Sequence, residues 1–141
     1  MIKTSTEKDV QFEIQLSGCA IIKDDKLLLL KKYKNSYYEL PGGKVDLEED
    51  IIDAAIREVK EETGAEGKII KALIPVTYWF VLEKEKVRKT VYYFLMEYVG
   101  GDITKHDHEM ETVVWLLKDK VEKRLTYKSD KIVWKEAKNL I

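Results

Sequence analysis

Three glutamates share one face of the helix that the sequence predicts between Asp50 and Thr63. Glu58, Glu61 and Glu62 have the spacing i, i+3, i+4, which at about 100° per residue gathers their carboxylates in one narrow sector. Like charges at this spacing repel one another, and the helix dipole disfavours anions near the carboxyl end. A hard divalent cation such as Mg²⁺, which binds carboxylate oxygens, would offset the repulsion. The charge pattern by itself is also typical of a solvated acidic face.

A proline–glycine–glycine segment lies just before this helix. Pro41, Gly42 and Gly43 suit neither a helix interior nor a central strand, so we expect irregular backbone here. Because glycine allows close approach, a main-chain carbonyl of this segment could complete a metal site with the glutamates. The presence of this glycine segment beside the glutamates favours a metal site over a solvated acidic face.

The segment from Gly43 to Ala65 resembles the Nudix box, whose pattern is G, five residues, E, seven residues, then R-E-U-x-E-E-x-G-U with U apolar. Val59 and Ala65 fill the two apolar positions, Ala65 being a small residue for that place. The seven fixed positions are all matched, by Gly43, Glu49, Arg57, Glu58, Glu61, Glu62 and Gly64. A pattern of this length with fixed spacing is highly specific.

The resemblance implies a hydrolase that uses Mg²⁺, or Mn²⁺ in its place, to cut a diphosphate linkage commonly attached to a nucleoside. It also implies an ion pair between Arg57 and Glu49 that joins loop to helix, which suits the planar, two-pronged guanidinium. The metal ligands that it implies are Glu58, Glu61, Glu62 and the Gly43 carbonyl.

Two carboxylates are candidates for the group that takes the proton from the attacking water. Glu58 is one, and the other lies in the polar segment 105–111, where family members often carry an acidic residue shortly before a strand containing Trp. Glu109, six residues before Trp115, fits that arrangement better than Glu111, although a polar surface loop is the alternative. The predicted catalytic set is Arg57, Glu58, Glu61 and Glu109, and Glu109 is also a predicted metal ligand.

The last two thirds of the chain resembles the asymmetric diadenosine tetraphosphate hydrolase subgroup, through Tyr78-Trp79-Phe80, 89–95 and 125–128. The resemblance implies that Tyr78 or Phe80 stacks the adenine together with Tyr127, and that Lys89 contacts phosphate. Lys44, beside the glycine turn, is a further candidate for a phosphate contact. Strand core is the alternative role for the aromatic residues, of which all three cannot face one pocket.

One departure leaves the substrate open. The subgroup usually has Pro-Lys-Gly where this chain has Pro41-Gly42-Gly43, a form common in relatives that hydrolyse oxidised nucleoside triphosphates, nucleotide sugars or ADP-ribose. We therefore expect a dinucleoside polyphosphate, with MutT-like hydrolysis of (8-oxo-)(d)NTP, or of nucleoside diphosphate sugars or ADP-ribose, as alternatives. A catalytically silent nucleotide-sensing module and an RNA-end hydrolase are further alternatives, but the complete box favours an enzyme.

Composition sets the remaining limits. The 141 residues fit a single domain, 1–141, and a net charge of −1 argues against a general nucleic-acid coat. Cys19 has no second cysteine to pair with, and no apolar run approaches the length of a membrane span. We expect a cytoplasmic protein with a small nucleotide substrate and without a membrane or stable nucleic-acid partner. The oligomeric state stays open.

The periodicity predicts an α+β chain in which helices do not alternate regularly with strands. Expected strands cover 10–22 and 27–30 as a hairpin, 68–82 and 87–99 as a second hairpin, and 112–116. The helix over 50–63 should bury Ile52, Ala55, Ile56 and Val59 and end at Gly64. A second helix over 129–141, capped by Ser129 or Asp130, should bury Ile132, Val133, Ala137 and Leu140. The Nudix resemblance implies an α/β/α sandwich with a mixed sheet between helices.

Overall fold

A computed structural model describes residues 12–32, 36–106 and 111–141 of the chain. Glu109 lies outside these residues. Among the described residues, no helix is of a length and apolarity that would let it cross a membrane. The elements in chain order are β1 (Phe12–Lys23), β2 (Lys26–Lys32), β3 (Tyr38–Glu39), β4 (Gly42–Lys44), α1 (Ile51–Thr63), β5 (Ala65–Ala72), β6 (Val76–Leu82), β7 (Glu85–Gly101), β8 (Glu111–Leu117), α2 (Lys118–Arg124) and α3 (Lys128–Lys138).

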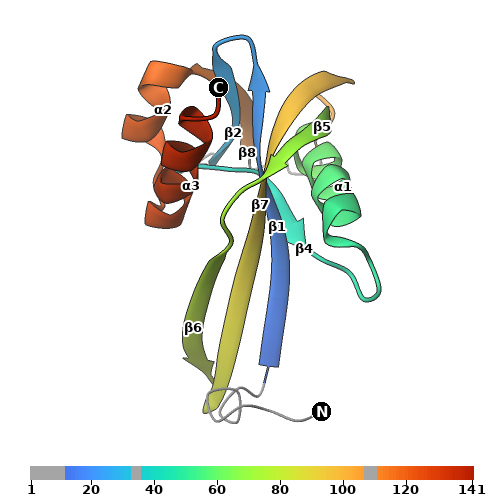
Figure 1. Cartoon of the computed structure of the whole chain (residues 1–141), viewed down its shortest axis with the longest axis vertical. Helices are drawn as coiled ribbons and strands as arrows, with labels where there is room; N and C mark the ends of the chain where they lie inside the picture. Colours follow the sequence, from blue (N-terminus) through green and yellow to red (C-terminus); the bar gives the residue numbers. More distant parts are fainter. Residues whose placement is uncertain (1–11, 33–35, 107–110) are drawn as a thin grey trace.

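One mixed sheet forms the centre of the fold. Its main path runs β3-β2-β1-β7-β5, while β4 pairs with β1, β6 with β7, and β8 with β2. The β1–β7 pair is parallel and extends from Phe12 opposite Val87 to Ile22 opposite Glu97. Helix α1 covers one face of the sheet, and α2 and α3 cover the other (Figure 1). The predicted α/β/α sandwich is therefore confirmed.

Two hydrophobic clusters lie on opposite faces of the sheet, because successive strand residues point to opposite sides. On β1, Ala20 and Ile22 belong to the cluster beneath α2 and α3, whereas Cys19 and Ile21 belong to the cluster beneath α1. The Cys19 thiol is buried beside the Ala55 carbonyl, at 3.7 Å, and burial raises the pKa of this thiol. Cys19 is therefore a core residue, as its apolar neighbours in the sequence predict.

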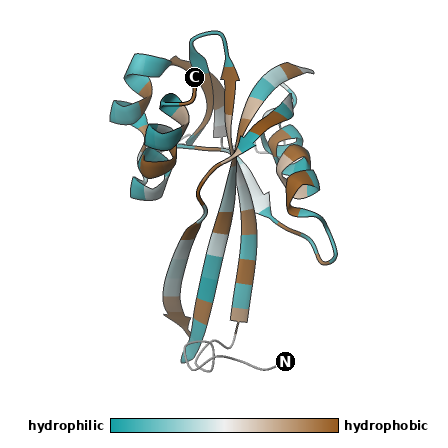
Figure 2. Ribbon diagram, in the orientation of Figure 1, coloured by the Kyte–Doolittle hydropathy of each residue, from teal (hydrophilic) through white to brown (hydrophobic). Residues whose placement is uncertain are grey.

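The lower half of the sheet projects from the helices as an arm made of β6 and the adjoining ends of β1 and β7 (Figure 1). Hydrophobic and hydrophilic residues alternate along β1 and β7 in this arm (Figure 2). The two strands of the predicted hairpin, β6 and β7, are antiparallel and place Tyr78 opposite Lys89. This pairing brings an aromatic ring and a cation to one side of the arm.

Helix α1 has the predicted ends but a different buried face. Asp50 caps its first turn by accepting the Ile52 N–H at 2.8 Å, and Gly64 ends it with a left-handed φ of 79° that favours glycine. Ile52 and Ile56, which the periodicity assigns to the core, are exposed at 45% and 38%. The prediction was wrong for these two residues because the helix contacts the sheet through small side chains. Its buried residues are Ala54, Ala55, Val59 and Thr63.

Two backbone predictions need correction. The single strand expected over 68–82 is two strands, β5 and β6, separated around Pro75, which has no N–H to donate to a sheet. Gly42 and Gly43 are not irregular but form most of β4, where they pair with Gly18 and Ser17 of β1. The glycine segment is thereby fixed to the centre of the sheet.

The carboxyl-terminal region also differs from the prediction. Helix α3 begins at Lys128 with no side-chain cap, so the predicted capping by Ser129 or Asp130 was wrong. Helix α2 was missed because it is short, with Val121 as its buried residue. Helix α3 ends at Lys138, before Leu140. Ile132 and Leu140, both expected in the core, are exposed at 55% and 42%, whereas Trp134 is 1% exposed.

Replacing Trp134 by alanine should lower the free energy of unfolding by about 3–5 kcal/mol, since it removes a large buried ring. Chemical denaturation with urea would measure the change. The matched control, Ile132→Ala on the exposed side of the same helix, should stay within about 0.5 kcal/mol of wild type. Equal losses in the two variants would contradict this assignment of the buried face.

Candidate metal and nucleotide site

Arg57 connects the segment after β4 to helix α1. Its Nε and Nη2 atoms donate to the two carboxylate oxygens of Glu49, both at 2.8 Å, and Nη2 also donates to the Lys44 carbonyl at 3.0 Å. This fork holds the pKa of Glu49 at about 2, well below its usual value. The structure thus contains the pair between Arg57 and Glu49 that the family resemblance implies.

The same guanidinium contacts two of the three clustered glutamates. Nη1 of Arg57 donates to Glu58 Oε1 at 2.9 Å and to Glu61 Oε2 at 3.1 Å. The third, Glu62, accepts the Gly42 N–H at 2.7 Å through Oε1. Arg57 and Glu62 therefore attach α1 to the segment from Gly42 to Glu49, and Arg57 also holds Glu58 and Glu61. Among the described residues, no three Asp, Glu, His or Cys side chains are gathered into a cluster that could hold a metal ion.

Glu58 is a partly buried carboxylate. The pKa of Glu58 is raised chiefly by burial, against the lowering effect of Arg57. Glu58 lies directly against the main chain of β4, since a Cβ atom built on Gly43 would come within 2.2 Å of its Oε2. Opposite Gly43 in the sheet, Ser17 holds a buried hydroxyl that has no hydrogen-bond partner within the part of the chain that the structure describes.

These donors fit a hard divalent cation. Glu58, Glu61, Glu62 and the Gly43 carbonyl all offer oxygen, the atom that Mg²⁺ and Mn²⁺ prefer. The close approach at Gly43, which a side chain would block, keeps the main chain within reach of the Glu58 carboxylate. The donor chemistry of these residues thus suits the predicted metal role, while their carboxylates are held by Arg57 and Gly42 and are not gathered around one point.

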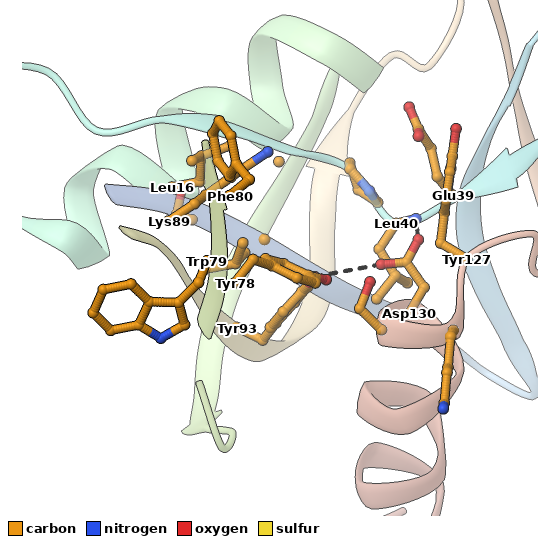
Figure 3. A pocket seen from close by; sticks show the side chains of 17 residues that line it. Leu16, Glu39, Leu40, Tyr78, Trp79, Phe80, Lys89, Tyr93, Tyr127 and Asp130 are labelled. Atoms are coloured by element: carbon orange, nitrogen blue, oxygen red, sulfur yellow. Dashed lines mark hydrogen bonds between the residues drawn. The ribbon is translucent and has the colours of Figure 1, made fainter. Parts of the chain in front are cut away.

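A cavity of about 670 Å³ lies on the other side of the glycine segment. Figure 3 shows Phe80 and Lys89 on one side of it and Tyr127 and Asp130 on the other, with Tyr78 between them. The cavity is within the size range of small-molecule sites. Its walls come from β1, the segment 39–42, β6, β7 and the start of α3.

Four predicted substrate residues line this cavity together. They are Tyr78, Phe80, Lys89 and Tyr127. Trp79 also belongs to the lining, but its ring points away from the rings of Tyr78 and Phe80 (Figure 3), with Lys86 Nζ 5.0 Å from its centre. The three consecutive aromatic rings therefore do not all face one way, as strand alternation predicts. Lys44 is not part of the lining; its side chain is exposed, and its carbonyl accepts from Arg57.

Sequence reasoning missed Asp130 as a site residue. Its carboxylate accepts the Leu40 N–H at 3.1 Å and the Tyr93 hydroxyl at 3.4 Å, the second shown in Figure 3. Burial and the nearby charge of Glu39 raise the pKa of Asp130 to about 6. A serine–aspartate pair at the start of a helix is typical of a cap, which concealed this position.

The chain is similar in sequence to proteins with known names. The chain is 38% identical to the Mycobacterium tuberculosis protein named MutT4 over 104 residues, which are 74% of this chain and 42% of that protein. It is 34% identical to the ADP-ribose pyrophosphatase of Methanocaldococcus jannaschii over 94 residues, 64% of this chain and 54% of that protein. The matches thus span about half of each relative.

A solved structure has the same fold. The MutT protein from Bacillus halodurans matches with a TM-score of 0.69 and 25% identity, covering 86% of this chain and 80% of that one. The family model described as the NUDIX domain matches residues 15–135, which include α1, the glycine segment and the cavity walls. This chain therefore belongs to the NUDIX domain family.

Proposed function

We propose that this chain hydrolyses a phosphoric anhydride of a nucleotide with the help of a divalent metal ion. The observation that carries the proposal is the position of Gly42. Its N–H donates to Glu62 on the acidic face of α1, and the same residue lines the aromatic cavity. A nucleotide needs these two environments side by side, cations for its phosphates and flat apolar surfaces for its base.

The metal would be held by the acidic face and the adjoining glycine. Glu58, Glu61 and Glu62 would supply carboxylate oxygens, and Gly43 its carbonyl. When bound, Mg²⁺ or Mn²⁺ neutralises phosphate charge and lowers the pKa of a coordinated water. Arg57 holds these carboxylates in place through its bonds to Glu58 and Glu61.

A proton acceptor is required for attack by water on phosphorus. Glu58 is our first candidate, because its pKa is raised and it lies against Gly43. Glu109 stays the second candidate, both as the base and as a metal ligand.

The cavity supplies the nucleoside site. Tyr127 approaches from the start of α3, and Tyr78 and Phe80 come from β6, so a base would stack between aromatic side chains of two elements. Lys89 on β7, opposite Tyr78 of β6, lines the same cavity and is our candidate for a phosphate contact. Lys44 remains a weaker candidate, since its side chain lies outside the cavity lining.

We favour a nucleoside triphosphate as substrate. The relatives carry the names MutT4 and ADP-ribose pyrophosphatase, which correspond to the MutT-like and ADP-ribose alternatives more closely than to diadenosine tetraphosphate. One aromatic cavity also suits one base. A second described cavity, of about 320 Å³, is lined by other residues of the chain, including Ile70 and Ile141. ADP-ribose is our second candidate, and the dinucleotide and the cytoplasmic location stay predictions.

Glu62→Gln should abolish most of the Mg²⁺-dependent turnover of deoxynucleoside triphosphates while the chain stays folded. The amide can still accept the Gly42 N–H but lacks the negative charge that a metal requires. We expect kcat to fall by at least about 100-fold, the upper end of the effect of removing an outer partner of a metal ligand. Chromatography of the nucleoside monophosphate product would measure it.

Glu66→Gln is the control for this variant, because Glu66 is an exposed carboxylate just beyond α1 whose partner is Lys60 at 3.2 Å. It should leave kcat unchanged. Wild-type turnover in the Glu62 variant, with circular dichroism showing both proteins folded, would refute the metal role of Glu62.

Gly43→Ala should weaken Mn²⁺ binding by about 10–100-fold, because the added methyl group must displace the Glu58 carboxylate. Electron paramagnetic resonance of free Mn²⁺ would report the affinity without requiring turnover. Gly100→Ala is the matched control, since among the atoms of the described residues its Cβ would meet only Glu66 Oε2, at 3.4 Å. Equal Mn²⁺ affinity in the two variants would contradict a site at Gly43.

A further inference from the structure

Asp130 is a buried carboxylate in the wall of an aromatic cavity. Four charged side chains line that cavity, those of Glu39, Lys89, Lys128 and Asp130. Of these four, Asp130 alone is buried, at 6% exposure. A small number of fixed polar groups in a largely apolar pocket is the usual source of ligand orientation and specificity.

The protein satisfies only part of the hydrogen-bonding capacity of this carboxylate. An ionised carboxylate offers about four acceptor positions. From residues 12–32, 36–106 and 111–141, Asp130 receives two donors, the Leu40 N–H on Oδ2 and the Tyr93 hydroxyl on Oδ1. Among the described Lys, Arg and His side chains, none forms an ion pair with it, and Glu39 adds a like charge nearby. A ligand that brought further N–H donors would relieve the cost of this burial.

We propose that Asp130 recognises the base of the bound nucleotide by accepting hydrogen bonds from adjacent ring and exocyclic N–H groups, the pattern that guanine presents. The inference rests on the proposed function, because it takes the cavity as the nucleoside site. Each carboxylate oxygen keeps one acceptor position after its protein donor is counted, so the two oxygens match two neighbouring donors on one edge of a base.

The other bases fit this acceptor pair less well. The corresponding edge of adenine or cytosine places a ring nitrogen acceptor next to its amino group, which would face a carboxylate oxygen. Uracil and thymine place carbonyl oxygens on both sides of their single N–H. Hypoxanthine retains the ring N–H of guanine but lacks the exocyclic amino group, which makes dITP the most informative analogue of dGTP.

Asp130 also has a structural contact that the test must separate from recognition. Asp130 at the start of α3, together with Thr126 just before the helix, attaches this part of the chain to the segment from Tyr38 to Leu40. Thr126 Oγ1 accepts the Tyr38 N–H at 2.9 Å, and its own N–H donates to the Tyr38 carbonyl at 3.0 Å. A loss of this attachment would impair all nucleotides alike, whereas a loss of base recognition would depend on the base.

The experiment compares kcat/KM for dGTP and dITP in wild type, Asp130→Asn and Thr126→Val. We expect wild type to favour dGTP by about tenfold or more, the effect of one hydrogen bond to a charged acceptor. In the Asn variant an amide group replaces one acceptor oxygen, so the ratio should collapse toward one, mainly through KM. In the Thr126 variant the ratio should persist, even if both values fall.

Calorimetry of dGMP and dIMP binding separates the inference about Asp130 from the proposed hydrolase function. Hydrolysis with an unchanged dGTP-to-dITP ratio in the Asn variant overturns the inference and leaves the proposed function intact. Absence of hydrolysis, with dGMP binding that depends on Asp130, overturns the proposed function alone. A wild-type protein that treats dGTP and dITP equally, in turnover and in binding, overturns the inference without any variant.

Discussion

The bidentate pair between Arg57 and Glu49 is the interaction on which the candidate site depends. It fixes the segment after β4 to α1. The third nitrogen of the same guanidinium, Nη1, holds Glu58 and Glu61. Three neighbouring carboxylates on a helix repel one another, so their arrangement needs a cation. Arg57 supplies one within the protein, and a divalent ion would supply a stronger one during catalysis.

The sheet determines what lies next to these carboxylates. Because β4 pairs with the middle of β1, the glycine segment lies between the acidic face of α1 and the cavity formed by β6, β7 and α3. The segment is bound on both sides, through the Gly42 N–H to Glu62 and through the Leu40 N–H to Asp130. The candidate metal and nucleoside regions are therefore joined by one short segment, in which the two bonded N–H groups lie two positions apart.

Local sequence patterns predicted α1 and its ends, because these depend on spacing within about twenty residues, and the resemblance to the Nudix box implied the contact between Arg57 and Glu49. They could not show that Ile52 and Ile56 are exposed, since periodicity defines an apolar stripe but not which part of it meets the sheet. Tyr78 and Phe80 became candidates through the resemblance to the diadenosine tetraphosphate hydrolase subgroup, and strand alternation indicated that Trp79 between them faces the other way. Asp130 was not a candidate, because its burial arises where α3, Tyr93 and Leu40 meet, and those residues are far apart in the chain.

The most direct test of the account is a crystal structure of the protein grown with Mn²⁺, with anomalous scattering used to locate the metal. The account predicts a manganese peak bounded by the carboxylates of Glu58, Glu61 and Glu62 and by the carbonyl of Gly43. A structure at saturating Mn²⁺ in which Arg57 still holds Glu58 and Glu61, with no manganese on that face of α1, would contradict it.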